Sequence, residues 1–266
     1  MKKGIDVSTW QGNIDFNKLS DVEFIMIRAG FGKNNIDDCA INNAIGAKKH
    51  NIPFGLYWFS YAYTVEMAKQ EANYCCDFAD KYGATYPIAY DWEEDSVEYA
   101  KKNGVNPTDS LVEQMTIAFL EQVKKRGYTP ILYANWSDLS WCYKNIYKKY
   151  DLWYSCPDVD KPAVNCAIWQ YSWSKHYNGI YGDVDADYCY KDYNKSYDIH
   201  YDINDKDKEI LNAQFNTIFW NKYTEAAKDV IAGKYKSGSE RRKLLTQAGY
   251  DYDFVQTIVN YMMRDC

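Results

Sequence analysis

Histidine is scarce in this chain, which has three His among 266 residues, and its eight cysteines form no C-x-x-C pair. Structural zinc sites need closely spaced Cys and His ligands, so we do not expect zinc. Clustered carboxylates can also bind Mg²⁺ or Ca²⁺, but no loop has the Asp- and Asn-rich spacing of an EF-hand. A divalent-metal site therefore ranks below a metal-free interpretation, and no cofactor is expected.

The chain also lacks a surplus of positive charge and a long apolar run. It has 31 Lys and Arg against 37 Asp and Glu, a net charge of −6. Phosphate binding depends on clustered cations, so we expect no nucleic-acid partner. No run approaches the ~20 apolar residues of a membrane span. The opening MKKGIDVSTW has no apolar segment of a signal peptide. We therefore expect synthesis in a cytoplasm, with reduced thiols.

Aromatic residues, in contrast, are abundant, with 27 Tyr and 9 Trp. Rings with a polar edge suit sugar-binding clefts, because the apolar faces of pyranose rings stack on them. The competing interpretation is that any single Tyr simply packs in the core or lies on the surface.

Short β-rich runs alternate with helical patterns along the first 200 residues. The runs are 4–7, 23–28, 53–59, 86–92, 129–134, 151–155, 166–171 and 184–190. The helical patterns are 37–50, 64–82, 110–126 and, more weakly, 136–147, and Ser110 with Glu113 predicts a capping box. This alternation predicts an α/β fold, a TIM-like barrel with eight strands. The connections 156–165 and 172–183 are too short for helical crossovers, so the last strands should lack outer helices and run partly antiparallel.

Carboxylates gather where the predicted strands end. Asp6 ends the first strand, Asp91 and Glu93 end the fourth within YPIAYDWEED, and Asp185 lies in the last. Active sites of barrels lie at the carboxyl ends of the strands, and residues i and i+2 share a face. Paired carboxylates have their pKa values pushed apart, which supplies an acid at neutral pH. The alternative is a strand end that is merely solvated.

Several motifs resemble glycoside hydrolase family 25, the muramidase family of phage and bacterial lysozymes. They are GIDVSTWQGNIDF at 4–16, IRAG at 27–30, YDWE at 90–93, WQYS and GDVDAD. The resemblance covers about the first 195 residues. It implies a barrel with fewer outer helices and cleavage of the β-1,4 bond between N-acetylmuramic acid and N-acetylglucosamine in peptidoglycan.

The resemblance also implies roles for individual residues. Glu93 matches the general acid, Asp91 its partner, and Asp6 and Asp185 the two remaining acids of the cleft. The residues that we expect to contact substrate are Tyr57, Tyr61, Tyr133, Trp153 and Trp58. Phe16 and Trp58 depart from the residues common in the family, and the second departure bears on a substrate contact. Trp10 and Gln11, in the first motif, are interpreted as structural.

The spacing of the acid pair bears on the mechanism. A nucleophilic carboxylate usually lies across the bond from the acid, about 5–5.5 Å away. Asp91 neighbours Glu93 on one strand and is poorly placed for that attack. We therefore favour attack by the substrate's own 2-acetamido group, oriented by Asp91, and keep direct attack by an Asp as the alternative.

The remaining chain divides into an expected linker, 196–218, and a small all-α three-helix domain, 219–266, after a barrel domain of 1–195. Ser237 and Glu240 predict a second capping box, and Asp251 or Asp253 the start of a third helix running through Ile258 and Met262. AAKDVIAGKYKSGSERRKLLTQAGYDYDFVQTIVN resembles the cell-wall-binding repeat of some phage endolysins.

A single repeat implies modest wall affinity, since linked copies would add avidity. The functional interpretation of Arg241 and Arg242 is that one of them pairs with a stem-peptide carboxylate. The alternative is a solvated basic helix face.

The partner implied overall is bacterial peptidoglycan, reached from the host cytoplasm through a phage holin. The competing hypothesis is an inactive barrel that only binds glycan, and the oligomeric state is left open.

Overall fold

The computed structural model describes residues 1–193, 223–236, 238–248, 250, 252, 255–256 and 258–259. Contacts divide the chain into two units, Met1–Tyr197 and Asp198–Cys266. The expected linker lies outside the described residues.

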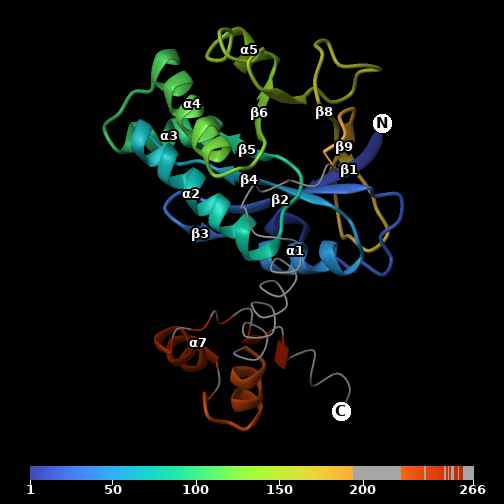
Figure 1. The fold of residues 1–266 in the computed structure, drawn as a ribbon, viewed down its shortest axis with the longest axis vertical. Helices are drawn as coiled ribbons and strands as arrows, with labels where there is room; N and C mark the ends of the chain where they lie inside the picture. The colour runs from blue at the N-terminus through green and yellow to red at the C-terminus, as the bar shows by residue number, and fades with distance from the viewer. Residues whose placement is uncertain are drawn as a thin grey trace, which may run out of the picture. The chain divides into compact units, whose positions relative to one another are not determined.

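Eight strands close into a barrel in the first unit (Figure 1). They are β1 (Lys2–Val7), β2 (Phe24–Phe31), β4 (Phe54–Phe59), β5 (Ile88–Asp91), β6 (Pro130–Asn135), β7 (Asp151–Ser155), β8 (Ile168–Lys175) and β9 (Val184–Cys189). Neighbours from β1 through β8 are parallel, and β1 pairs with β2. Strand β9 runs antiparallel to both β8 and β1. The predicted barrel is confirmed, including its partly antiparallel closure.

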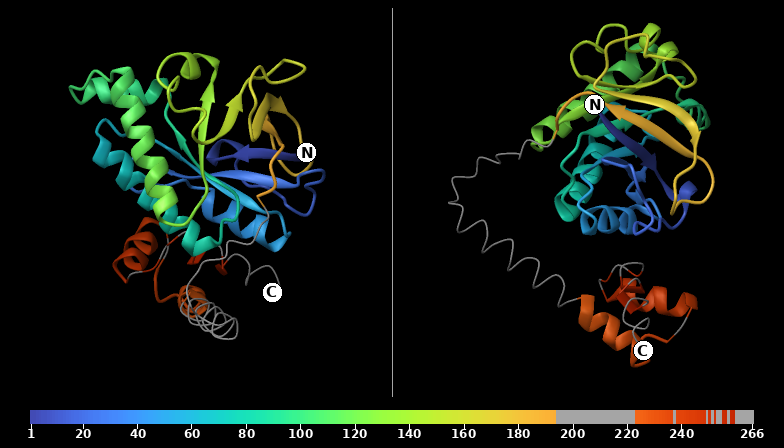
Figure 2. Two further views of the ribbon diagram at one scale, coloured as in Figure 1. Left: turned by 45° about the horizontal axis from the view of Figure 1, so that its top comes forward. Right: turned by 90° about the vertical axis from the view of Figure 1, so that its right-hand side faces the viewer.

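Outer helices cover only the first part of the barrel (Figure 2). They are α1 (Ala40–Lys49), α2 (Val65–Tyr82), α3 (Glu94–Lys102), α4 (Asp109–Lys125) and the short α5 (Trp136–Ser140). Residues 141–193, all of them described, contain no helix. The prediction that the last strands lack outer helices is confirmed. The weak pattern 136–147 is helical only over α5, and the rest forms turns.

Two elements differ from the expectation in detail. A two-residue strand, β3 (Asn35–Ile36), pairs with the end of β2, and the short helix α3 follows the acidic run directly. The prediction of a capping box at Ser110 is wrong. The extended residue Thr108 caps α4, its hydroxyl accepting from the Leu111 N–H at 3.3 Å, and Ser110 lies inside the helix.

Large rings fill the barrel interior at the end where the parallel strands begin. Phe24 at the start of β2 stacks on Tyr86, with ring centroids 5.3 Å apart, and Tyr86 packs against Tyr193 at 5.5 Å. Burying aromatic surface of this size stabilises the fold strongly. These rings close one end of the barrel and leave the other end for polar side chains.

The second unit is helical over 223–231 and over α7 (Gly238–Gln247). Its buried residues are Tyr223, Ala226, Ala227, Val230, Leu245, Val255, Ile258 and Val259. Ser237 of the expected capping box lies outside the described residues, as do Asp251, Asp253 and Met262. Of the helices that the structure describes, none is long and apolar enough to cross a membrane.

Candidate active site

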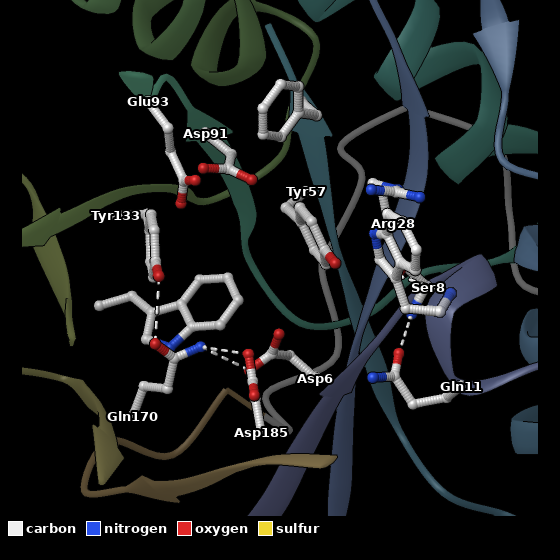
Figure 3. Close-up of a pocket in the computed structure, with 13 residues that line it drawn as sticks. Asp6, Ser8, Gln11, Arg28, Tyr57, Asp91, Glu93, Tyr133, Gln170 and Asp185 are labelled. Atoms are coloured by element: carbon white, nitrogen blue, oxygen red, sulfur yellow. Dashed lines mark hydrogen bonds between the residues drawn. The ribbon is translucent and has the colours of Figure 1, made fainter. Parts of the chain in front are cut away.

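A pocket opens where the parallel strands end. Its lining residues are Asp6, Ser8, Trp10, Gln11, Arg28, Tyr57, Phe59, Asp91, Glu93, Tyr133, Trp153, Gln170 and Asp185. All four acids predicted from the sequence line this pocket. Figure 3 shows Asp91 and Glu93 on one side of it, and Asp6 with Asp185 on the other.

Asp91 and Glu93 form one pair of acids. Asp91 is the last residue of β5 and is buried, whereas Glu93, just before α3, is exposed at the open side. Trp92 between them turns away and is buried. The two carboxyls share a hydrogen bond. Desolvation raises the pKa of both, and repulsion from Glu93 raises that of Asp91 further. The pair therefore keeps a proton to a higher pH than two separate carboxyls would, and that proton belongs to the pair.

Asp6 and Asp185 form the opposite wall. Burial raises the pKa of Asp6 well above its usual range. Burial, followed by repulsion from Asp6 and Glu93, raises the pKa of Asp185 to about 8. Asp185 lies near the start of β9 and not at a strand end. The antiparallel direction of β9 is what brings it to the same edge as Asp6.

A fifth acid, Asp187, was missed by the sequence analysis. Its Oδ1 accepts from Trp153 Nε1 at 2.8 Å, and it shares a hydrogen bond with Asp6. Burial raises its pKa to about 7. The other oxygen, Oδ2, is buried and has no hydrogen-bond partner among the described residues. The same i, i+2 argument that selected Asp91 and Glu93 applies to Asp185 and Asp187, and it would have found this residue.

Gln170, in the middle of β8, was also missed, and it connects the two sides of the pocket. Its Nε2 donates to Asp6 Oδ2 at 2.8 Å and to Asp185 Oδ2 at 3.3 Å. Its Oε1 accepts from Ser155 Oγ at 2.6 Å and from Tyr133 OH at 3.1 Å. An amide inside a buried strand requires such partners. Its place in the WQYS motif was the available signal.

Arg28 from the IRAG motif is the basic residue among those that line the pocket. Its Nε donates to Asp37 Oδ2 at 2.8 Å, and Asp37 also accepts from the backbone N–H of Thr9 and Cys39. This buried ion pair fixes the guanidinium at the pocket wall. There Arg28 lowers the pKa of Asp91, against the larger effect of burial.

The predicted aromatic contacts divide into two groups. Tyr57, Tyr133 and Trp153 line the pocket. Tyr61 lies beside it, packed between Phe59 and Tyr99 at centroid distances of 5.3 and 4.9 Å.

The expectation for Trp58 is wrong. Its indole is completely buried, donates to the Gly32 carbonyl at 3.2 Å and packs against Tyr74 of α2. Successive strand residues face opposite sides of the sheet, so Trp58 faces the helices while Tyr57 faces the pocket.

The interpretation of Trp10 as structural is also corrected. Its side chain is 82% exposed at the pocket mouth, so it contributes little to packing. Gln11 agrees with a structural interpretation, because its Oε1 accepts from the Ser8 N–H at 2.9 Å and closes a capping box.

The two arginines of the second unit differ in their surroundings. Arg241 donates to the Lys236 carbonyl at 3.0 and 2.8 Å and to Gln256 Oε1 at 2.9 Å. These contacts argue that Arg241 holds its own unit together and is not free to bind a ligand. Arg242 is exposed, with its guanidinium 4.4 Å from the centre of the Tyr252 ring.

The described part of the chain does not provide the ligand sets that metal ions need. Among the described residues, no group of three or more His, Cys, Asp or Glu side chains is arranged to hold a metal ion. The pocket acids instead contact one another and Gln170.

Known proteins resemble this chain over the barrel. An autolytic lysozyme of Clostridium acetobutylicum is 26% identical over 189 residues, which cover 70% of this chain and 55% of that protein. A second match is the modular autolysin LytC from Streptococcus pneumoniae, whose structure was solved in complex with a synthetic peptidoglycan ligand. The two sequences are 27% identical. Its TM-score is 0.62, and the match covers 70% of this chain and 46% of that one. This chain thus spans about half the length of these two relatives.

A third match covers nearly the whole of its counterpart. The catalytic domain of endolysin ply40, from bacteriophage P40 of Listeria monocytogenes, is 25% identical with a TM-score of 0.62. It covers 73% of this chain and 95% of that one. Residues 224–263 match the CW_7 repeat, and residues 5–180, more than half of the 266 residues, match glycosyl hydrolases family 25. The chain belongs to glycosyl hydrolases family 25.

Proposed function

We propose that this protein is a muramidase that hydrolyses the β-1,4 bond between N-acetylmuramic acid and N-acetylglucosamine in bacterial peptidoglycan. The observation that carries the proposal is the proton-sharing pair of Asp91 and Glu93 in an aromatic pocket at the end of the barrel. A carboxyl that remains protonated near neutral pH can act as a general acid on a glycosidic oxygen. The relatives named as a lysozyme and an autolysin bound to a peptidoglycan ligand support this substrate.

Glu93 is the proposed general acid, because its carboxyl lies at the open side of the pocket. It donates its proton to the glycosidic oxygen as the bond from that oxygen to the anomeric carbon breaks. The carbonyl oxygen of the 2-acetamido group bonds to the anomeric carbon and forms an oxazolinium ion. Glu93, now a carboxylate, takes a proton from the water that attacks the same carbon and restores the acetamido group.

Asp91 is the proposed partner of the acetamido group. Its Oδ1 has no hydrogen-bond partner among the described residues, so it can accept from the acetamido N–H. When the shared proton is on Glu93, Asp91 is a carboxylate, and it then stabilises the positive charge that develops on the ring. Asp91 shares a hydrogen bond with Glu93 and does not lie across the bond from it. Direct nucleophilic attack would have to come from the opposite wall, from Asp6 or Asp185.

The aromatic walls suit a sugar ligand. Tyr57 and Trp153 form a buried floor, Tyr133 is partly exposed, and Trp10 extends into solvent at the mouth. We propose that Trp10 stacks on a pyranose ring, which its exposed indole can do without moving any packed neighbour.

We further propose a division of labour between three segments. Residues 1–195 catalyse, 196–218 link, and 219–266 bind the wall. The match of 224–263 to the CW_7 repeat supports the last assignment, and Arg242 is the candidate contact for a stem-peptide carboxylate. The protein then acts on the bacterial wall, either as an endolysin released by a phage or as an autolysin.

The test uses purified protein and purified peptidoglycan. We expect new reducing ends, and reduction with borohydride should convert them to muramitol. Glucosaminitol would identify a glucosaminidase and contradict the proposed bond. Binding to peptidoglycan without any new reducing end would support the alternative of an inactive glycan-binding barrel.

A further inference from the structure

A buried acid, Glu71, lies behind the pocket and takes no part in the chemistry described above. It belongs to α2 and is 3% exposed. Its Oε2 lies 2.5 Å from Ser60 Oγ, and its Oε1 accepts from the Tyr61 N–H at 3.0 Å. Among the described residues no ion pair compensates it, since burial raises its pKa and the groups that oppose this are Ser60 and Tyr61. An isolated buried acid of this kind is costly and calls for an explanation.

Both partners of Glu71 belong to the short segment 60–62 that follows β4. This segment is rigidly built. The Ser60 hydroxyl accepts from the Ala62 N–H at 3.0 Å and lies 3.0 Å from the Tyr90 hydroxyl. Glu71 therefore fixes two consecutive residues of the segment, one through its side chain and one through its backbone.

The segment 60–62 is bonded in turn to the residues of the acid pair. The Ser60 N–H donates to the Asp91 carbonyl at 2.7 Å. The Trp92 indole N–H donates to the Ala62 carbonyl at 3.4 Å. Each of these bonds holds one residue of the stretch that carries both acids.

Glu93 is connected to the segment through one intermediate. The Ser60 carbonyl accepts from Ser96 Oγ at 2.6 Å, and that hydroxyl accepts from the Glu93 N–H at 3.1 Å. Ser96 is completely buried in the first turn of α3. All three residues from Asp91 to Glu93 are thus held by the segment that Glu71 holds.

We propose that Glu71 is a positioning residue for Glu93, acting as a neutral acid that fixes segment 60–62 and, through it, the stretch from Asp91 to Glu93. This inference rests on the proposed function for its meaning in catalysis. Its geometry does not depend on the substrate. Catalysis is sensitive to displacement of an acid by as little as about 1 Å, so a rigid connection of this kind has a direct effect on rate.

The neutral form fits the surroundings of Glu71. Burial raises its pKa to about 8, and the titratable group that faces it from β5 is the Tyr90 hydroxyl. As an acid it can donate to Ser60 Oγ through Oε2 while Oε1 accepts from the Tyr61 N–H. A glutamine can make the same two bonds, with its amide nitrogen donating and its oxygen accepting.

The test compares Glu71→Gln with Glu71→Leu on soluble peptidoglycan fragments at pH 6. We expect the Gln variant to keep kcat within about threefold, because both bonds survive. The Leu variant keeps the volume but loses both bonds, and its kcat should fall about 10- to 100-fold with KM nearly unchanged. Ser60→Ala removes the next hydrogen-bonding group between Glu71 and Glu93. It should likewise lower kcat with KM nearly unchanged, and it replaces Glu71→Leu if that variant does not fold.

The matched control is Phe78→Leu, a buried substitution on the same helix, at a ring that packs against Tyr82 with centroids 4.4 Å apart. If it lowers kcat per folded molecule as much as Glu71→Leu does, the role of Glu71 is only structural and the proposal is overturned. A Gln variant as impaired as the Leu variant, or a Leu variant with normal kcat, would also overturn it.

A second measurement separates this inference from the proposed function. The titration of the Glu93 carboxyl, followed by ¹³C NMR, should shift by about one pKa unit in Glu71→Leu and stay unchanged in Glu71→Gln. This result needs no substrate. If wild-type protein releases no reducing ends but the shift is seen, the proposed function fails and the positioning role stands. An unshifted titration overturns the positioning role.

Discussion

Asp6 on β1 lies directly opposite Asp185 on β9, and both carboxyls receive hydrogen bonds from the same amide nitrogen of Gln170. In a fully parallel barrel, the first residues of the last strand would lie at the end away from the pocket. The reversed direction of β9 brings Asp185 to the pocket end instead. The acid wall facing Asp91 and Glu93 is therefore a product of the antiparallel closure.

The first prediction concerns the general acid. Glu93→Gln keeps the size and hydrogen-bonding capacity of the side chain but removes the titrating proton. We expect kcat for peptidoglycan cleavage to fall by about 10²–10⁴-fold with substrate binding retained. Release of reducing ends and a pull-down on purified wall measure the two quantities.

The neighbouring residue provides the control for that change. Glu94 is exposed in the first turn of α3, and Glu94→Gln changes the local charge equally. It should leave kcat within about twofold, because it loses only an exposed charge near a helix N-terminus. A Glu93→Gln variant that keeps most of its activity would show that another group is the acid.

The second prediction concerns Asp91 and the acetamido group. Asp91→Asn should impair cleavage severely, because it removes the charge that stabilises the oxazolinium ion. De-N-acetylated muramic acid should be a very poor substrate for the wild-type protein, since it lacks the attacking group. Trapping a sugar ester on Asp6 or Asp185 by mass spectrometry would establish direct attack and rule out the assisted route.

The third prediction links the acid cluster to stability. The pKa of Asp185 is raised to about 8 in the folded protein from its ordinary value of 3.8. Below about pH 4 the group is protonated in both states, so it does not penalise folding there. Between about pH 4 and 8 the unfolded chain loses its proton before the folded protein does, so stability falls as pH rises.

Asp185→Asn removes this titration. Its melting temperature should exceed that of the wild type at pH 8, and the gain should shrink towards pH 4.5. Asp183→Asn is a suitable control, because Asp183 is exposed in the adjoining loop. Differential scanning calorimetry across this range measures the effect. A wild-type melting temperature that rises from pH 5 to pH 8, with no gain from the Asn variant, would contradict the prediction.

The fourth prediction concerns the second unit. A chain ending at residue 205 should cleave soluble fragments like the full chain but lyse intact walls more slowly, because local concentration at the wall is lost. Unfolding of the truncated barrel, measured by circular dichroism, would instead make the second unit a structural support.

Arg242 gives this prediction a residue-level test. Arg242→Glu in the full chain should weaken sedimentation with purified peptidoglycan if its guanidinium meets a stem-peptide carboxylate. Lys243→Glu makes the same charge change at an exposed neighbouring position and serves as control. An equal loss in both variants would indicate general electrostatic attraction without a defined contact.

The sequence predicted the barrel well because its signals are local and repeated. Alternating β-rich and helical stretches with short final connections define eight strands and their missing helices. The sequence analysis did not predict helix α3, because the first turn of this helix is the acidic run, which was interpreted only as a strand end. Thr108 was overlooked as a cap because Ser110 with Glu113 matched the familiar spacing better.

The site was predicted less completely, since its contacts are long-range. The four acids could be identified from position and resemblance. The hydrogen bond from Gln170 to Asp6 forms only because the barrel closes and brings their strands together. A local sequence pattern does not predict how the barrel closes. Trp58 was misassigned because resemblance to a motif does not say which face of β4 a side chain takes. Trp10 was misjudged for the opposite reason, since exposure depends on what surrounds the first turn.

The closure of the barrel has a consequence for engineering. Lys2 pairs with Cys189, whereas Asp6 pairs with Asp185 at the pocket end, so the chain enters and leaves the barrel side by side, away from the catalytic mouth. A short peptide could join these two positions in a circular permutant, with new ends opened in an exposed loop such as that around Gly104. For the same reason, a protein domain fused near Lys2 or Cys189 would leave the pocket unobstructed. The barrel could therefore be combined with other domains.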